Sequence, residues 1–288
     1  RIGGGQFKAP DNAPFMADLP ASGVLGTLVY SYDVASDFLE ETRNVVVWLP
    51  PGYEDNADQR YKVIYMSDGE NLFDPRIASW GVDWGIDEAM MRGVAEGSFE
   101  PAIVVGTWST ARRGLEYSPW HEADDHARFL IEELVPRINA GYRTQRGPEN
   151  TFVMGSSMGG LLSYYLVKEH GDVFGACGCV SSHFALSEEM YSGWMSEEDV
   201  DATPYVVRDI EAGAKVTGGR FFFDYGTETL ESTYEADHKP VVAWMRKQGL
   251  KKNRDYRFVR YDGADHSERA WRARVLDQLE WLLGEPGR

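Results

Sequence analysis

The chain has little positive charge, almost no cysteine and no long hydrophobic run. Its 29 lysines and arginines are outnumbered by 46 aspartates and glutamates, so the formal net charge is −17 at pH 7. A basic stripe for nucleic-acid phosphates is therefore not expected, and an anionic membrane surface would repel the chain. No run approaches the roughly 18 apolar residues of a membrane helix. Solubility, or a saline habitat, is the simplest explanation of the acidic excess.

The two cysteines, Cys177 and Cys179, lie two positions apart in an apolar run. A strand would place both side chains on one face with little room for a bridge, so no disulfide is expected between them. Two cysteines are also too few to form a zinc site by themselves. The two cysteines do not indicate in which cellular compartment the protein works. A secreted or periplasmic protein that has lost a signal segment before Arg1 is one expectation, and a cytoplasmic protein is the other.

The composition is that of a folded globular protein. The 288 residues are 43% hydrophobic and 26% charged, which excludes disordered, collagen-like and coiled-coil chains. The glycines and prolines near the start predict an N-terminal arm over residues 1–19. Residues 20–288 are then expected to form one domain. The irregular acidic and aromatic stretch over residues 183–203 is a candidate for a small cap.

Short apolar runs alternate with helical patterns through the rest of the chain. Strands are predicted over Val24–Val34, Arg43–Leu49, Lys62–Met66, Ala102–Thr107, Thr151–Met154, Gly175–Ser181, Arg220–Tyr225 and Tyr256–Tyr261. Helices are predicted over Trp84–Val94, Asp124–Asn139, Met158–His170, Pro204–Ala212, Tyr234–Lys247 and Ser267–Leu283. This alternation is typical of βαβ units. It predicts an α/β protein with a mostly parallel central sheet flanked by helices.

A G-x-S-x-G motif is the strongest local signal. It places Ser157 between a predicted strand and a predicted helix, in the segment Gly155–Gly159. A tight turn of this kind needs glycine where the backbone segments approach closely, and it lifts the serine hydroxyl above the sheet. A structural turn is the alternative, but the position between strand and helix favours a nucleophile.

A serine nucleophile needs a base, and His266 is the candidate because it follows the last predicted strand and precedes the last helix. His183 ends another strand at the same edge of the sheet, so it is expected either to contact substrate or to be structural. His126 and His238 fall on charged helical faces and are expected to be solvated.

The orienting acid is expected in the loop after the strand Arg220–Tyr225. Glu228 and Glu231 are both candidates, and their spacing alone does not choose between them. Either glutamate can instead be a charge that stabilises the N-terminus of the next helix. Asp224 is expected inside the strand.

The oxyanion hole needs two backbone N–H donors. We assign one to Met158, which follows the nucleophile, and the other to Glu70 in the loop after the strand Lys62–Met66, with Asn71 next. Asn71, Trp84, Arg113 and His183 are the side chains expected to contact substrate.

Three separated segments resemble the putative-esterase family of α/β-hydrolases. Residues 67–74, SDGENLFD, resemble its DGQNLFD segment; residues 155–160, GSSMGG, match its serine turn; residues 262–271 resemble its terminal G-x-x-H-x-x-x-x-W. The family includes feruloyl and acetylxylan esterases of carbohydrate esterase family 1, S-formylglutathione hydrolases, siderophore esterases and mycolyltransferases. The resemblance covers roughly residues 45–283.

This resemblance implies an α/β-hydrolase fold with no metal and no organic cofactor. It places the catalytic base at His266. Some members carry a GTxTLD loop that is similar to residues 226–231, GTETLE, which assigns the acid to Glu231 and keeps Glu228 in reserve. The glutamate is one methylene longer than the family's aspartate.

The expected activity is ester hydrolysis through an acyl-enzyme on Ser157, with esters of small alcohols, sugars or phenolic acids as substrates. The expected partner is therefore a small-molecule or carbohydrate-linked ester. Two other classes stay open: an acyltransferase that uses the same triad, and a non-catalytic binding protein on this fold. The sequence does not predict the oligomeric state.

Overall fold

The structure is a computed structural model that describes residues 23–188 and 202–284. The predicted arm over residues 1–19 and most of the expected cap over residues 183–203 lie outside these ranges. No described helix combines the length and the apolar character that are needed to cross a bilayer.

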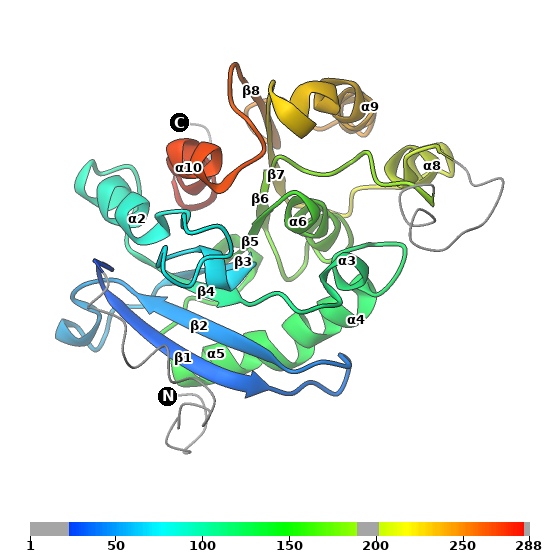
Figure 1. Cartoon of the computed structure of the whole chain (residues 1–288). Coiled ribbons are helices and arrows are strands. Elements are labelled where there is room, and N and C mark those ends of the chain that lie inside the picture. Colours follow the sequence, from blue (N-terminus) through cyan, green and yellow to red (C-terminus); the bar gives the residue numbers. More distant parts are fainter. Residues whose placement is uncertain (1–22, 189–201, 285–288) are drawn as a thin grey trace.

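One eight-stranded sheet runs through the molecule in the order β1-β2-β4-β3-β5-β6-β7-β8 (Figure 1). The pairs β1–β2 and β2–β4 are antiparallel, and all the other pairs are parallel. The prediction of a mostly parallel sheet is thus confirmed. The strands are β1 (Thr27–Val34), β2 (Arg43–Leu49), β3 (Lys62–Ser67), β4 (Ala102–Thr107), β5 (Thr151–Ser156), β6 (Ala176–Val180), β7 (Arg220–Gly226) and β8 (Tyr256–Tyr261).

Helices cover both faces of the sheet (Figure 1). One face carries α2 (Ile86–Ala95) and α10 (Glu268–Leu283), and these two helices contact each other. The helices that contribute to the apolar core on the other face are α4 (Ala123–Arg128), α5 (Val135–Gly141), α6 (Met158–Glu169), α8 (Tyr205–Glu211) and α9 (Tyr234–Lys247). The short helix α3 is Arg113–Glu116.

Alternating side chains along the central strands fill the two apolar cores. In β7, Phe221 and Phe223 enter the core beneath α6 and α9, whereas Phe222 enters the core beneath α10. In β3, Tyr65 enters the same core as Phe221 and Phe223, and Ile64 enters the same core as Phe222. This is the period of two that a strand buried on both faces imposes, and it explains why the strands are continuous apolar runs.

The helix predicted over Asp124–Asn139 is interrupted. A π-helical turn, Phe129–Leu134, separates α4 from α5. Pro136 lies in the first turn of α5, and because proline has no N–H it cannot donate the hydrogen bond that a continuous α-helix requires there.

Two expectations about single side chains were wrong. Cys177 and Cys179 form a buried disulfide on β6, and their Cα atoms are 5.7 Å apart, within the ordinary range for a bridge. Both side chains do share one face of the strand, but that spacing permits the bond. His126 and His238 are fully buried rather than solvated, because their helices pack these positions against aromatic rings.

Candidate active site

Ser157 sits on the sharp turn between β5 and α6. Its backbone has φ 56° and ψ −118°, a conformation that costs free energy for any residue with a side chain. The Ser157 amide donates a hydrogen bond of 3.0 Å to the Val180 carbonyl at the end of β6, which holds the turn against the neighbouring strand. The predicted strand–serine–helix arrangement is therefore present.

The glycines of this turn are required by close packing. A Cβ atom on Gly155 would lie 2.7 Å from the carbonyl carbon of Gly159. A Cβ atom on Gly160 would lie 2.7 Å from Ser182 Oγ and 2.8 Å from the Val180 carbonyl oxygen. Real Cβ contacts are longer than these, so alanine at either position would push the helix away from the sheet.

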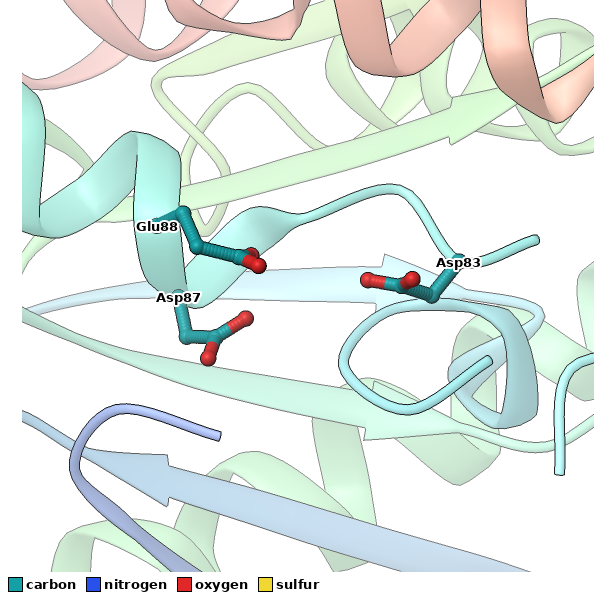
Figure 2. Close-up of side chains that lie close together, drawn as sticks. All are labelled: Asp83, Asp87 and Glu88. Atoms are coloured by element: carbon teal, nitrogen blue, oxygen red, sulfur yellow. The ribbon is translucent and has the colours of Figure 1, made fainter. Parts of the chain in front are cut away.

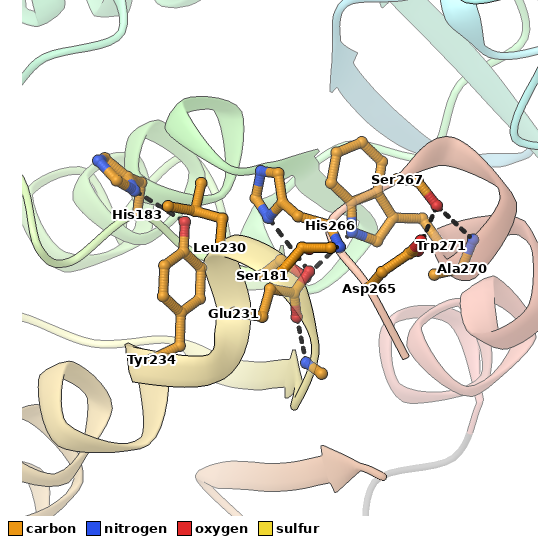
Figure 3. Close-up of polar contacts among 12 residues, drawn as sticks. Ser181, His183, Leu230, Glu231, Tyr234, Asp265, His266, Ser267, Ala270 and Trp271 are labelled. Atoms are coloured by element: carbon orange, nitrogen blue, oxygen red, sulfur yellow. Dashed lines mark hydrogen bonds and ion pairs between the residues drawn. The ribbon is translucent and has the colours of Figure 1, made fainter. Parts of the chain in front are cut away.

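His266 and Glu231 are brought together from separate loops (Figure 3). The Nδ1 atom of His266 lies 3.1 Å from Oε1 of Glu231. His266 follows β8 and Glu231 follows β7, and the glutamate is fully buried. Glu228, the other candidate acid, is exposed, and its backbone amide bonds to the Ala264 carbonyl. Of the two glutamates, only Glu231 meets the histidine.

Besides His266, three groups surround the Glu231 carboxylate. Ser181 Oγ donates to it at 2.6 Å, the Gly226 amide donates to its other oxygen, and the Arg274 guanidinium lies 3.5 Å away. Burial alone would raise the pKa of this carboxyl, but the hydrogen bonds from His266, Ser181 and Gly226 and the Arg274 charge bring it below its ordinary value. The carboxylate is therefore ionised at neutral pH.

A second buried acid lies behind this group. Asp224 is inside β7, as expected, and accepts hydrogen bonds from Arg274 at 2.9 Å, Gln278 at 2.6 Å and the Ser181 amide at 3.1 Å. Sequence reasoning missed Arg274, Gln278 and Ser181. The helical spacing of Trp271, Arg274 and Gln278 on α10 is a signal that could have found Arg274 and Gln278, because these positions share one face of a helix.

Ser157 and His266 line one cavity of about 610 Å³. Three of the four residues expected to contact substrate, Asn71, Trp84 and Arg113, also line it. The Arg113 guanidinium forms two hydrogen bonds to the Asp68 carboxylate, of 2.6 and 2.8 Å. The Asn71 side chain accepts a hydrogen bond of 2.8 Å from the Ser79 amide.

His183 is not among the side chains that line this cavity. It is buried, and its amide donates to the Ser157 carbonyl at 3.1 Å. Its Nδ1 lies 2.7 Å from the Tyr234 hydroxyl (Figure 3). Burial, with the charges of His266 and Arg113, lowers the pKa of His183 to about 4. The His183 amide thus supports the turn, and its ring bonds to Tyr234, whose hydroxyl also bonds to the Ser157 side chain. That His183 contacts substrate stays a prediction.

The turn after β3 approaches the start of α6. Asp68 has φ 56°, and the Asn71 amide donates to the Asp68 carbonyl at 2.9 Å. A Cβ atom on Gly69 would lie 2.6 Å from the backbone of Gly106 in β4, so only glycine fits where the turn packs against that strand. Both amides of this turn have a partner, since the Asn71 amide is used within the turn and the Glu70 amide bonds to its own carboxylate. The assignment of Glu70 before Asn71 as oxyanion donor therefore stays a prediction.

Three carboxylates form a separate acidic group at the start of α2 (Figure 2). Oxygens of Asp83, Asp87 and Glu88 lie within 4.8 Å of one another. Arg272 donates to Asp83 at 2.7 Å and to Glu88 at 2.8 Å, and the Leu25 amide donates to Asp87 at 2.7 Å. The guanidinium already supplies the positive charge that a metal ion would bring, so we assign no metal to this group.

Known proteins share both the sequence pattern and the fold. A curated relative from Bacillus subtilis (strain 168), "Uncharacterized protein YbbA", is 21% identical over 262 residues, which are 84% of this chain and 93% of that protein. The Endo-1,4-beta-xylanase/feruloyl esterase of Xylanibacter ruminicola is 27% identical over 149 residues, 50% of this chain. This match spans 20% of the Xylanibacter protein.

Solved structures with the same architecture include esterases. A ferulic acid esterase from Anaeromyces mucronatus has a TM-score of 0.64 at 19% identity, over 93% of this chain and 94% of that one. Enterochelin Esterase from Shigella flexneri has a TM-score of 0.67 at 17% identity, over 91% and 59%. The fold is thus that of the α/β-hydrolases. Residues 36–282 match the family described as "Putative esterase", and the chain belongs to that family.

Proposed function

We propose that the chain is a serine carboxylic-ester hydrolase with Ser157 as nucleophile, His266 as base and Glu231 as orienting acid. The proposal rests on one arrangement: Ser157, on its strained turn, lines the same cavity as His266, whose Nδ1 lies 3.1 Å from the buried Glu231 carboxylate. A nucleophile, a base and an acid in this order are the elements of acyl transfer.

In the first step, His266 takes the Ser157 proton while Oγ attacks the ester carbonyl carbon. The bond to the alcohol oxygen then breaks, and the alcohol leaves with the proton from His266. Water attacks the resulting acyl-enzyme, with His266 again as base, and releases the acid and free Ser157. Glu231 keeps the proton on Nδ1 of His266 and stabilises the imidazolium that forms in each step.

The negative oxygen of the tetrahedral intermediate needs donors that are in place before the reaction. The Met158 and Glu70 amides are the proposed pair, since they start α6 and follow β3 at the same edge of the sheet. Losing one such donor typically costs about 2.7–4 kcal/mol of transition-state stabilisation.

The substrates we propose are acyl esters of small alcohols, sugars or phenolic acids. Structural relatives are named for ferulic acid and enterochelin, both of which carry aromatic rings. Tryptophans line the cavity of this chain, and aromatic side chains stack on such rings. Asn71, Trp84 and Arg113 are the proposed substrate contacts.

The test compares the protein with its Ser157→Ala variant on p-nitrophenyl acetate and with a fluorophosphonate label. We expect hydrolysis and one labelled serine in the parent, and neither in Ser157→Ala. Ser163→Ala is the matched control, because this buried serine of α6 bonds to the Gly159 carbonyl and does not line the cavity. Substantial hydrolysis by Ser157→Ala would refute the assignment of the nucleophile.

A further inference from the structure

Three tryptophans line the cavity that holds Ser157 and His266. Trp80 is 78% exposed, an unusual state for so large an apolar side chain. Trp84 and Trp271 are buried and pack against each other, with ring centroids 5.4 Å apart. The faces of tryptophan rings attract cations, and aromatic cages are a recurrent way to bind quaternary ammonium groups.

Carboxylates line the same cavity in excess of positive charge. Asp68 is paired with Arg113 through two hydrogen bonds, so that pair is neutral. The Glu70 carboxylate accepts hydrogen bonds from the Ser109 amide and hydroxyl, which are uncharged donors. Glu268 has no ion-pair partner within residues 23–188 and 202–284. Two carboxylates therefore line the cavity without a guanidinium or ammonium group of their own.

Burial and a neighbouring carboxylate act on the pKa of both glutamates. Burial raises the pKa of the Glu70 carboxyl, and the nearby Asp68 charge raises it further. Burial likewise raises the pKa of Glu268, and again Asp68 adds to the rise. A positive group in the cavity would favour the charged form of both glutamates, whereas an anionic group would be repelled.

The position of Glu268 indicates which part of an ester would meet this charge. Glu268 is the first residue of α10 and lies two positions after His266. In the proposed reaction, His266 delivers a proton to the departing alcohol, so the alcohol must lie on the His266 side of the cavity. Glu268 lines that side.

We propose that this cavity selects esters whose alcohol part carries an ammonium group, with Trp80, Glu268 and Glu70 as the residues that recognise the cation. The inference rests on the proposed ester hydrolysis and specifies its substrate class. Trp80 offers a ring face, and the two carboxylates offer charge. Attraction of this kind is weakened by salt, since part of the cavity wall is exposed.

The test compares an acetate ester of choline with its uncharged isostere, in which carbon replaces nitrogen, and with an acetate ester whose alcohol carries a sulfonate. Each kcat/KM is divided by the rate of that ester with hydroxide, because the ammonium group activates the ester chemically. At low ionic strength we expect this corrected kcat/KM to be about ten times higher for the choline ester than for the isostere. The sulfonate ester is expected to be the poorest of the three.

Two variants examine the recognition itself. The ratio of interest is the corrected kcat/KM for the choline ester divided by that for the isostere. Glu268→Gln and Trp80→Ala should each lower this ratio about threefold or more. Glu96→Gln is the matched control. This glutamate is exposed on the far end of α2 and should leave the ratio unchanged. Tetramethylammonium, added alone, should inhibit hydrolysis of the neutral ester competitively, and more weakly in Trp80→Ala.

The outcomes separate this inference from the proposed function. If the isostere is hydrolysed as well as the choline ester, or if Glu268→Gln and Glu96→Gln give the same ratio, the inference is overturned while the esterase assignment stands. If none of the esters is hydrolysed and the fluorophosphonate does not label Ser157, the proposed function itself fails.

Discussion

At the scale of single residues, the assignment of the orienting acid depends on the Glu231 carboxylate. Glu231→Gln keeps the size of the side chain but removes the charge that holds the proton on Nδ1 of His266. We expect kcat for p-nitrophenyl acetate to fall by up to about 10⁴-fold, since the imidazole would adopt the wrong tautomer. Glu228→Gln changes an exposed side chain and should have little effect. A larger loss in Glu228→Gln than in Glu231→Gln would reverse the assignment.

At this scale, motifs and single positions both predicted residues that line the cavity, Trp84 and Arg113 among the latter. Ser157 and His266 stand in patterns whose spacing fixes their place relative to a strand and a helix. His183 stands at a strand end too, but the sequence does not determine which way its ring points, and the ring lies against Tyr234 in the core. Ser181, which donates to Glu231, has no sequence signal of its own.

Among the elements, α10 is held to the sheet by a buried ion pair. Arg274 of α10 donates to Asp224 of β7 at 2.9 Å, and both side chains are almost fully buried. Arg274→Met would leave the Asp224 charge without its partner, which typically costs about 3–5 kcal/mol of the free energy of unfolding. Urea denaturation would measure this loss. Arg254→Met, which breaks an exposed pair with Asp255, should change stability by less than about 0.5 kcal/mol, and an equal effect of the two changes would contradict the argument.

Most strands and helices were predictable because each is a short apolar run or a clear helical pattern. β4, for example, has the predicted bounds Ala102–Thr107, and α9 has the predicted bounds Tyr234–Lys247. The sequence did not predict the π-helical turn before α5, because that turn depends on how Pro136 is accommodated in the packed helix. The disulfide of β6 was missed because local strand geometry varies by enough to bring Cys177 and Cys179 within bonding range.

For the molecule as a whole, two buried histidines make stability depend on pH. Burial lowers the pKa of both His183 and His238 to about 4, whereas in the unfolded chain each takes up a proton near pH 6.5. The unfolded state thus binds more protons in this range, so the free energy of unfolding falls as the pH drops from 6.5 to 4. Each histidine can contribute up to about 3 kcal/mol to this loss.

The variant His238→Phe measures one of these contributions. The imidazole packs among the rings of Phe184, Tyr225 and Phe258, so phenylalanine suits the site. Between pH 6.5 and 4, the variant should lose up to about 3 kcal/mol less stability than the parent protein. Parallel stability curves for the two proteins, measured by denaturant titration at each pH, would contradict this account.

The residues around the cavity come from two different parts of the chain. Ser157, Glu231 and His266 follow β5, β7 and β8, whereas Trp80, Trp84 and Arg113 come from the segments after β3 and β4. Replacements in residues 76–85 and 108–113 can therefore alter the cavity wall without changing the segments that carry Ser157, Glu231 and His266. Exchange of these two segments between family members is the direct route to a new substrate range with the proposed nucleophile, base and acid unchanged.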